Sequence, residues 1–70
     1  MTDIDALTRK IEESGLKEKY IYEKLGISKS AWYYKKKGKT LFTTQEIQTL
    51  CEVLSITSLR EKNDIFFAKV

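Results

Sequence analysis

Apolar residues recur along this chain at the spacing of short helices. Ile4, Leu7 and Ile11 lie three and four positions apart, which places them on one face of a helix. The spacing predicts a first helix over residues 3–14. Gly15 follows it and is suited to ending a helix.

Two further helices are predicted on either side of a tight turn. Ile21 and Leu25, four positions apart, indicate a helix over residues 17–25. Gly26 favours the reversal that follows, because glycine adopts positive φ freely. The next helix is expected over residues 29–37.

The expected helix 29–37 begins after Ser28, whose hydroxyl can accept a backbone N–H of the first turn. Ala31 and Trp32 are its predicted inward residues, together with the aliphatic stem of Lys35. Trp32 is interpreted as a packing residue.

A fourth helix has the clearest start signal in the sequence. Thr43 followed by Glu46 forms the pattern of a capping box, in which two side chains satisfy backbone N–H groups reciprocally. The apolar stripe that follows predicts a buried face, with the cysteine as a small core residue: Ile47, Leu50, Cys51 and Leu54.

The pattern repeats near the end of the chain, where Ser58 and Glu61 predict a fifth helix or helical tail. This segment offers more apolar area than one side of a short helix can hide, in Leu59, Ile65, Phe66 and Phe67. We therefore expect residues 57–70 to include a dimerisation surface.

Seventy residues with no alternating apolar pattern indicate one all-α domain over residues 1–70, a compact bundle of four to five short helices. The apolar runs are too short for a membrane span or a signal peptide, so we expect a cytoplasmic protein that does not bind membranes. One cysteine and no histidine favour neither a disulfide nor a metal site.

Composition also favours a binding role over catalysis. The chain has no histidine and no glycine-rich phosphate loop, and its cysteine is expected to be buried. Adjacent acids such as Glu12 and Glu13 are typical of a solvated helix surface. We therefore expect no catalytic residues, no cofactor and no small-molecule substrate.

Positive charge is concentrated in the middle of the chain. Residues 1–15, 16–40 and 41–70 have balances of −2, +6 and −1, which sum to the net +3. The segment between Lys29 and Lys39 has five lysines and no carboxylate. A solvated lysine face would explain this run alone, but joined to the helix, glycine turn and helix it indicates a surface that meets DNA phosphates.

The sequence KLGISKS at residues 24–30, with AWYYK, GKTLFT and the later EI…L…L stripe, resembles the lambda-repressor-like, Cro-like (XRE-type) helix-turn-helix family. The resemblance covers residues 11–56 and is strongest to small phage-encoded members. It implies a transcription regulator, a repressor-like protein of a phage or mobile element in a bacterial cell. It also implies that a homodimer binds double-stranded DNA at an operator.

Carried over residue by residue, the resemblance implies that the helix 29–37 lies in the major groove. Its base-contacting residues would be Lys29, Ser30, Tyr33 and Tyr34, which supply donors and acceptors for base edges. The expected phosphate contacts are Lys17, Lys19, Lys36, Lys37 and Lys39.

Three positions depart from the family pattern. Lys36 falls where small phage relatives often place an apolar residue, so we expect the end of the helix 29–37 to be shorter or more solvated than usual. Tyr22 replaces a small residue, so we expect the crossing of the two helices to open or the phenol to swing outward. Glu18 replaces a common glutamine, and its charge would repel phosphate unless Lys17, Lys19 or Lys24 neutralises it.

Two other classes of function stay open on the sequence. The first is a protein-interaction module, antirepressor-like or antitoxin-like, that would use Tyr22, Tyr33 and Tyr34 together with the Phe66–Phe67 tail. The second is a DNA architectural factor such as an excisionase, which would bend DNA at several sites.

Overall fold

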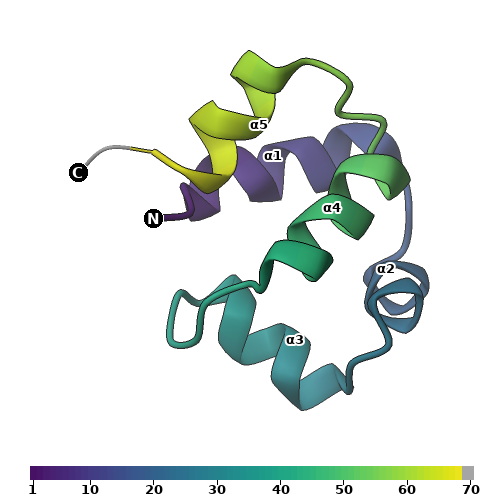
Figure 1. Cartoon of the computed structure of the whole chain (residues 1–70). Coiled ribbons are helices and arrows are strands. Elements are labelled where there is room, and N and C mark those ends of the chain that lie inside the picture. Colours follow the sequence, from purple (N-terminus) through teal and green to yellow (C-terminus); the bar gives the residue numbers. More distant parts are fainter. Residues whose placement is uncertain (69–70) are drawn as a thin grey trace.

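The computed structural model describes residues 1–68, and in this range the chain forms helices and turns without any strand. Figure 1 shows α1 and α5 side by side, α4 through the middle, and α2 and α3 on the other side. The all-α class is therefore confirmed. The bounds within the described residues are α1 (Ile4–Ser14), α2 (Glu18–Leu25), α3 (Lys29–Lys36), α4 (Thr44–Val53) and α5 (Leu59–Phe66).

The predicted helix ends agree with the structure to within one residue. Asp3 and Lys17, expected inside their helices, are the N-cap residues of α1 and α2, and Lys37 is the C-cap of α3. The capping box of α4 is confirmed. The Glu46 backbone N–H donates to Thr43 Oγ1 at 3.1 Å, and the Thr43 N–H donates to Glu46 Oε1 at 2.8 Å.

The capping box predicted for α5 is only half correct. The Glu61 backbone N–H donates to Ser58 Oγ at 3.3 Å, as expected. The Glu61 carboxylate, however, accepts a hydrogen bond from Lys10 Nζ of α1 at 3.2 Å. A tertiary ion pair therefore takes the place of the local contact and ties α5 to α1.

One apolar core joins all five helices. An aromatic row crosses it: the ring centroids of Trp32 and Phe42 are 6.0 Å apart, and those of Phe42 and Phe66 are 6.3 Å apart, both edge to face. Cys51, predicted to be a core residue, is instead half-buried at the edge of the core, where burial raises the pKa of its thiol. The buried residues are Leu7, Ile11, Ile21, Trp32, Phe42, Ile47, Leu50, Leu54, Ile56, Ile65 and Phe66.

The C-terminal segment contributes to this core more than the sequence indicated. Ile65 and Phe66 are 5% and 2% exposed, so they pack on their own chain and are not available to a partner. Leu59 and Phe67 remain 69% and 54% exposed. The surplus apolar area expected in residues 57–70 is thus reduced to two side chains, and Lys69 and Val70 lie outside the described residues.

Glycines end the two helices that the sequence predicts to meet DNA. Gly26 after α2 and Gly38 after α3 have φ of 73° and 78°, a left-handed conformation that is costly for residues with a Cβ. After α3, the Lys39 N–H donates to the Tyr34 carbonyl at 3.0 Å and the Gly38 N–H to the Lys35 carbonyl at 3.1 Å. The end of α3 is therefore held by two backbone bonds.

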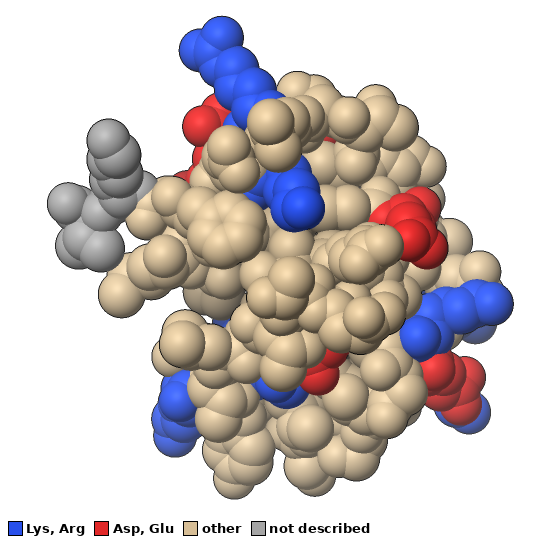
Figure 2. Space-filling view, in the orientation of Figure 1, with Lys and Arg blue, Asp and Glu red and all other residues tan. Residues whose placement is uncertain are grey.

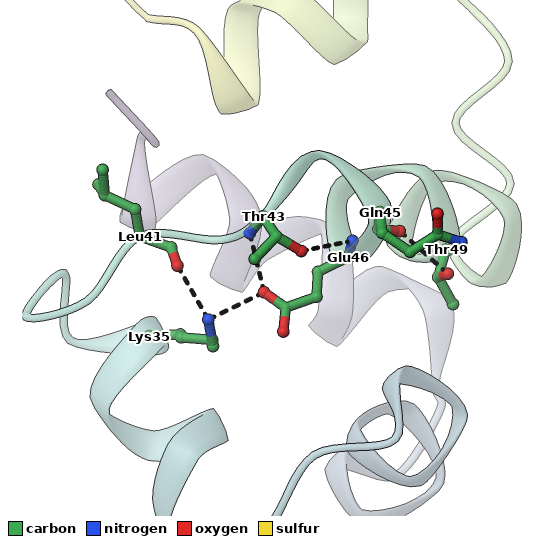
Figure 3. A network of polar contacts seen from close by, with 6 residues as sticks. All are labelled: Lys35, Leu41, Thr43, Gln45, Glu46 and Thr49. Carbon is green, nitrogen blue, oxygen red and sulfur yellow. Dashed lines mark hydrogen bonds and ion pairs between the residues drawn. The ribbon is translucent and has the colours of Figure 1, made fainter.

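A polar network fixes the loop between α3 and α4 (Figure 3). Lys35 Nζ donates to the Leu41 carbonyl at 2.9 Å and lies 2.9 Å from Glu46 Oε1, the atom that also caps α4. The Lys35 ammonium also lies 5.8 Å from the Phe42 ring centroid. The predicted inward stem of Lys35 is confirmed, since only 13% of its side chain is exposed.

The fold has the size of a close-packed domain of this length. Its radius of gyration is 11.0 Å, and a compact chain of this length has a value of about 11 Å. Within residues 1–68, no helix has both the length and the apolar character needed to cross a membrane.

Candidate nucleic-acid interface

The first two turns of α3 present one continuous exposed face. The Ala31 N–H donates to Ser28 Oγ at 3.1 Å, which fixes the start of the helix, and Trp32 points into the core with 3% exposure. Because Trp32 is inward, the residues on the opposite side face outward. The four predicted base-contacting residues line a shallow hollow of about 270 Å³: Lys29, Ser30, Tyr33 and Tyr34.

Both tyrosines of this face are exposed, Tyr33 by 56% and Tyr34 by 48%. A lysine from the end of α3 lies over each ring, with Lys37 Nζ 4.2 Å from the Tyr33 centroid and Lys39 Nζ 5.8 Å from that of Tyr34. Such cation–π contacts hold a ring while leaving the cation in solvent. The predicted phosphate-contacting lysines Lys37 and Lys39 therefore adjoin the predicted base-contacting tyrosines.

Lys36, the third predicted phosphate contact on this helix, is placed differently. Its Nζ lies 3.0 Å from Glu18 Oε1, and only 22% of its side chain is exposed. The same carboxylate oxygen accepts a hydrogen bond from Trp32 Nε1 at 2.8 Å. The sequence named Lys17, Lys19 and Lys24 as candidates to neutralise Glu18, but the neutralising cation is Lys36, the last residue of α3.

The hydrogen bond from Trp32, followed by that from Lys36, holds the pKa of Glu18 below its ordinary value, although partial burial acts in the opposite direction. Both donors stabilise the charged carboxylate. Glu18 is therefore ionised at neutral pH and does not act as an isolated negative charge.

The Glu18–Lys36 pair also brings the start of α2 next to the end of α3. Lys17 is the N-cap of α2 and makes no side-chain capping bond, and Lys19 lies in its first turn; both are exposed. The amides of that first turn lack intrahelical acceptors, which suits a helix N-terminus to an anion. Four of the five predicted phosphate-contacting lysines are thus exposed, and they come from these two helix ends.

Figure 2 shows how charge is arranged on one side of the molecule. Its lower edge, where Figure 1 places α3, consists of uncharged side chains; basic side chains project to the left of them, and basic and acidic side chains lie together to the right.

Comparisons of the chain with protein-family models, with curated proteins and with solved structures gave no match.

Two tyrosines on α2 differ from what the sequence indicated. Tyr22 is half-buried and packs against the core, so it does not join the exposed aromatic face of α3. Tyr20, which the sequence did not single out, is 47% exposed, and Lys24 Nζ lies 5.4 Å from its ring centroid. The spacing of four between Tyr20 and Lys24 was the available signal, since it places both on one side of α2.

Proposed function

We propose that this protein binds double-stranded DNA through α3 and acts as a lambda-repressor-like helix-turn-helix transcription regulator. The observation that carries the proposal is the outer face of α3, where Lys29, Ser30, Tyr33 and Tyr34 share one surface with exposed lysines at its end. Residues 24–45 contain no Asp or Glu. A phosphate-bearing ligand would be attracted by the exposed lysines of this stretch, among them Lys29, Lys37 and Lys39.

The dimensions of α3 suit the major groove. An α-helix with its side chains is about 10–12 Å across, which fits the groove's width of about 12 Å. Lys29 can donate to the O6 and N7 acceptors of guanine, and Ser30 can donate or accept at a base edge. The tyrosine hydroxyls one turn later reach either a base edge or a phosphate.

Lysines at the helix ends are assigned to the phosphate backbone. Lys37 and Lys39 would hold one strand at the end of α3, and Lys17 and Lys19 would hold the flanking strand at the start of α2. These contacts fix the position of α3 without reading sequence. The protein needs no cofactor for this role, which consists of occupying an operator.

A salt titration tests the proposal. If a homodimer neutralises on the order of six phosphates, the logarithm of the binding constant should fall against the logarithm of salt concentration with a slope near −5.

Selection from a random DNA pool should return a consensus, and a symmetric one would indicate two copies. A slope near zero, or no binding at low salt, favours the protein-interaction module instead. A bending assay identifies a DNA architectural factor.

A further inference from the structure

Glu18 is the first residue of α2, yet its carboxylate binds two side chains of α3. Its Oε1 accepts hydrogen bonds from Trp32 Nε1 at 2.8 Å and from Lys36 Nζ at 3.0 Å. Trp32 and Lys36 are four residues apart, so they lie above one another on the same side of α3. One oxygen atom therefore binds donors from successive turns of the helix.

The bond to Trp32 explains why an acceptor is needed but not why it is charged. Trp32 is 3% exposed, and a buried indole N–H without an acceptor destabilises the folded state. The amide oxygen of a glutamine at position 18 could also accept that N–H, although in a weaker, neutral hydrogen bond. The negative charge of Glu18 therefore has a separate effect, which falls on Lys36.

Lys36 lies on the same side of α3 as Trp32, and the ion pair with Glu18 holds its ammonium there, away from the surface that its neighbours occupy. Lys36 has 22% of its side chain exposed and lies against the Trp32 ring, with Nζ 6.0 Å from the centroid. Lys37 and Lys39 are exposed, and among residues 1–68 no carboxylate lies within ion-pair distance of either. Of the three lysines assigned to phosphate at this helix end, one has its charge cancelled.

We propose that Glu18 cancels the charge of Lys36 at the DNA-binding end of α3 and thereby limits the protein's affinity for non-specific DNA. The inference rests on the proposed function and deepens it. Attraction to phosphate acts on every DNA sequence alike, whereas base contacts distinguish sequences. A lysine held back from phosphate lowers the affinity for every sequence by a similar factor, so Glu18 limits non-specific binding through Lys36.

A charge cycle tests this role. Wild type, E18Q, K36Q and E18Q/K36Q are compared on a selected duplex and on a scrambled duplex over a range of salt concentrations. E18Q keeps an acceptor for Trp32 but releases Lys36, so we expect about fivefold tighter binding to both duplexes at low salt. Its salt slope should steepen by about 0.9 for each copy, or about 1.8 for a homodimer.

The other two variants of the cycle determine where the effect comes from. K36Q leaves the negative charge of Glu18 without a partner, and this charge should weaken binding to both duplexes. E18Q/K36Q removes both charges and should return to within about twofold of the wild type, because the pair contributes no net charge in either protein. Merely structural roles for these residues would not restore affinity when both are changed.

Glu23→Gln is the matched control, because it makes the same charge change at an exposed position of α2. It should raise affinity much less than E18Q, since it releases no lysine. Thermal unfolding of each variant checks the fold. If E18Q melts below the assay temperature, all variants of the cycle are titrated at a lower temperature at which E18Q is folded.

Three outcomes overturn the inference. If E18Q/K36Q binds as weakly as K36Q, Lys36 contacts phosphate directly in the wild type. If E23Q gains as much as E18Q, the effect is one of net charge alone. In both cases wild-type binding, and with it the proposed function, stands. A wild-type chain that shows no salt-dependent binding to any duplex overturns the proposed function and this inference together.

Discussion

Lys29 and Lys37 lie at opposite ends of α3, and their positions give them different roles in the proposed complex. Lys29→Ala should cost about 1–3 kcal/mol on the preferred site and relax the choice of base there. Lys37→Ala should weaken binding to all sequences and flatten the salt slope by about one unit for each copy bound. Titrations on matched and scrambled duplexes measure both effects. Equal behaviour of the two variants on both duplexes would contradict the orientation assigned to α3.

Single residues also mark how far the sequence could be interpreted. The inward position of Trp32 followed from its place in a helical period, and the αL glycines followed from their backbone preference. The Glu18–Lys36 pair could not be predicted in this way. Its partners are eighteen positions apart, and their contact depends on the angle between α2 and α3, which no local pattern encodes.

At the level of elements, Glu46 joins α3 to α4 and makes that junction sensitive to acid. Burial acts to raise the pKa of Glu46, but hydrogen bonds from Lys35 and from the Thr43 backbone outweigh it and hold the pKa below the ordinary value of 4.5. The Glu46 carboxylate therefore takes up a proton at a higher pH in the unfolded chain than in the folded one. The stabilisation that the ionised Glu46 gives to the folded state is therefore complete above the unfolded-state pKa and is lost as the pH falls through the lower folded-state pKa.

Glu46→Gln should reduce the free energy of unfolding at pH 7 by roughly 1 kcal/mol, because a charge-assisted hydrogen bond becomes a neutral one. The variant should also lose less stability than the wild type between pH 6 and pH 3. Urea denaturation at both pH values measures the difference. Glu52→Gln, an exposed change on the same helix, is the control and should keep the wild-type pH dependence. An unchanged pH dependence in the Glu46 variant would contradict the assignment.

The end of α4 contains a local strain that a single substitution should relieve. Ser55 has φ of 57°, and the Ile56 N–H donates to the Cys51 carbonyl at 2.8 Å across it. A left-handed conformation costs a residue with a Cβ roughly 1 kcal/mol, and glycine avoids this cost. Glycine also makes the unfolded chain more flexible, which offsets about half of the benefit, so about 0.5 kcal/mol of added stability remains. Ser55→Gly should therefore raise the melting temperature by about 3 °C. Ser55→Ala retains the strain and should give no increase.

The helix α5 shows why element type was easier to predict than element role. Ser58 and the apolar residues after it correctly indicated a helix. Which of those side chains face the core depends on how α5 packs against α1, and the Lys10–Glu61 pair contributes to that packing. Ile65 and Phe66 consequently face inward, whereas Phe67 follows the last residue of the helix and faces solvent.

For the whole molecule, the proposed homodimer now depends on Leu59 and Phe67. Their exposure suits a contact between two copies, and two recognition helices about 34 Å apart would read successive major grooves. Replacing both with serine should lower the apparent mass in sedimentation at micromolar concentration and leave the melting temperature of the monomer nearly unchanged. Operator affinity should fall more than non-specific affinity.

Phe66→Ser is the contrasting variant, because this ring belongs to the core and its replacement should unfold the chain. A wild-type protein that sediments as a monomer and binds a palindromic site without cooperativity would contradict dimerisation through this surface. Leu59 and Phe67 would then be exposed residues without a role in assembly.

The chain contains a single tryptophan, and its position makes it an intrinsic optical probe. The indole of Trp32 is buried, with its N–H on the Glu18 carboxylate and the Lys36 ammonium 6.0 Å from its ring. Excitation of an indole redistributes its electrons, so its emission wavelength responds to charges held close by. All tryptophan fluorescence of this protein therefore arises at the contact between α2 and α3. A ligand that shifts α2 against α3 would therefore change the emission wavelength of Trp32, and no attached dye would be needed to detect it.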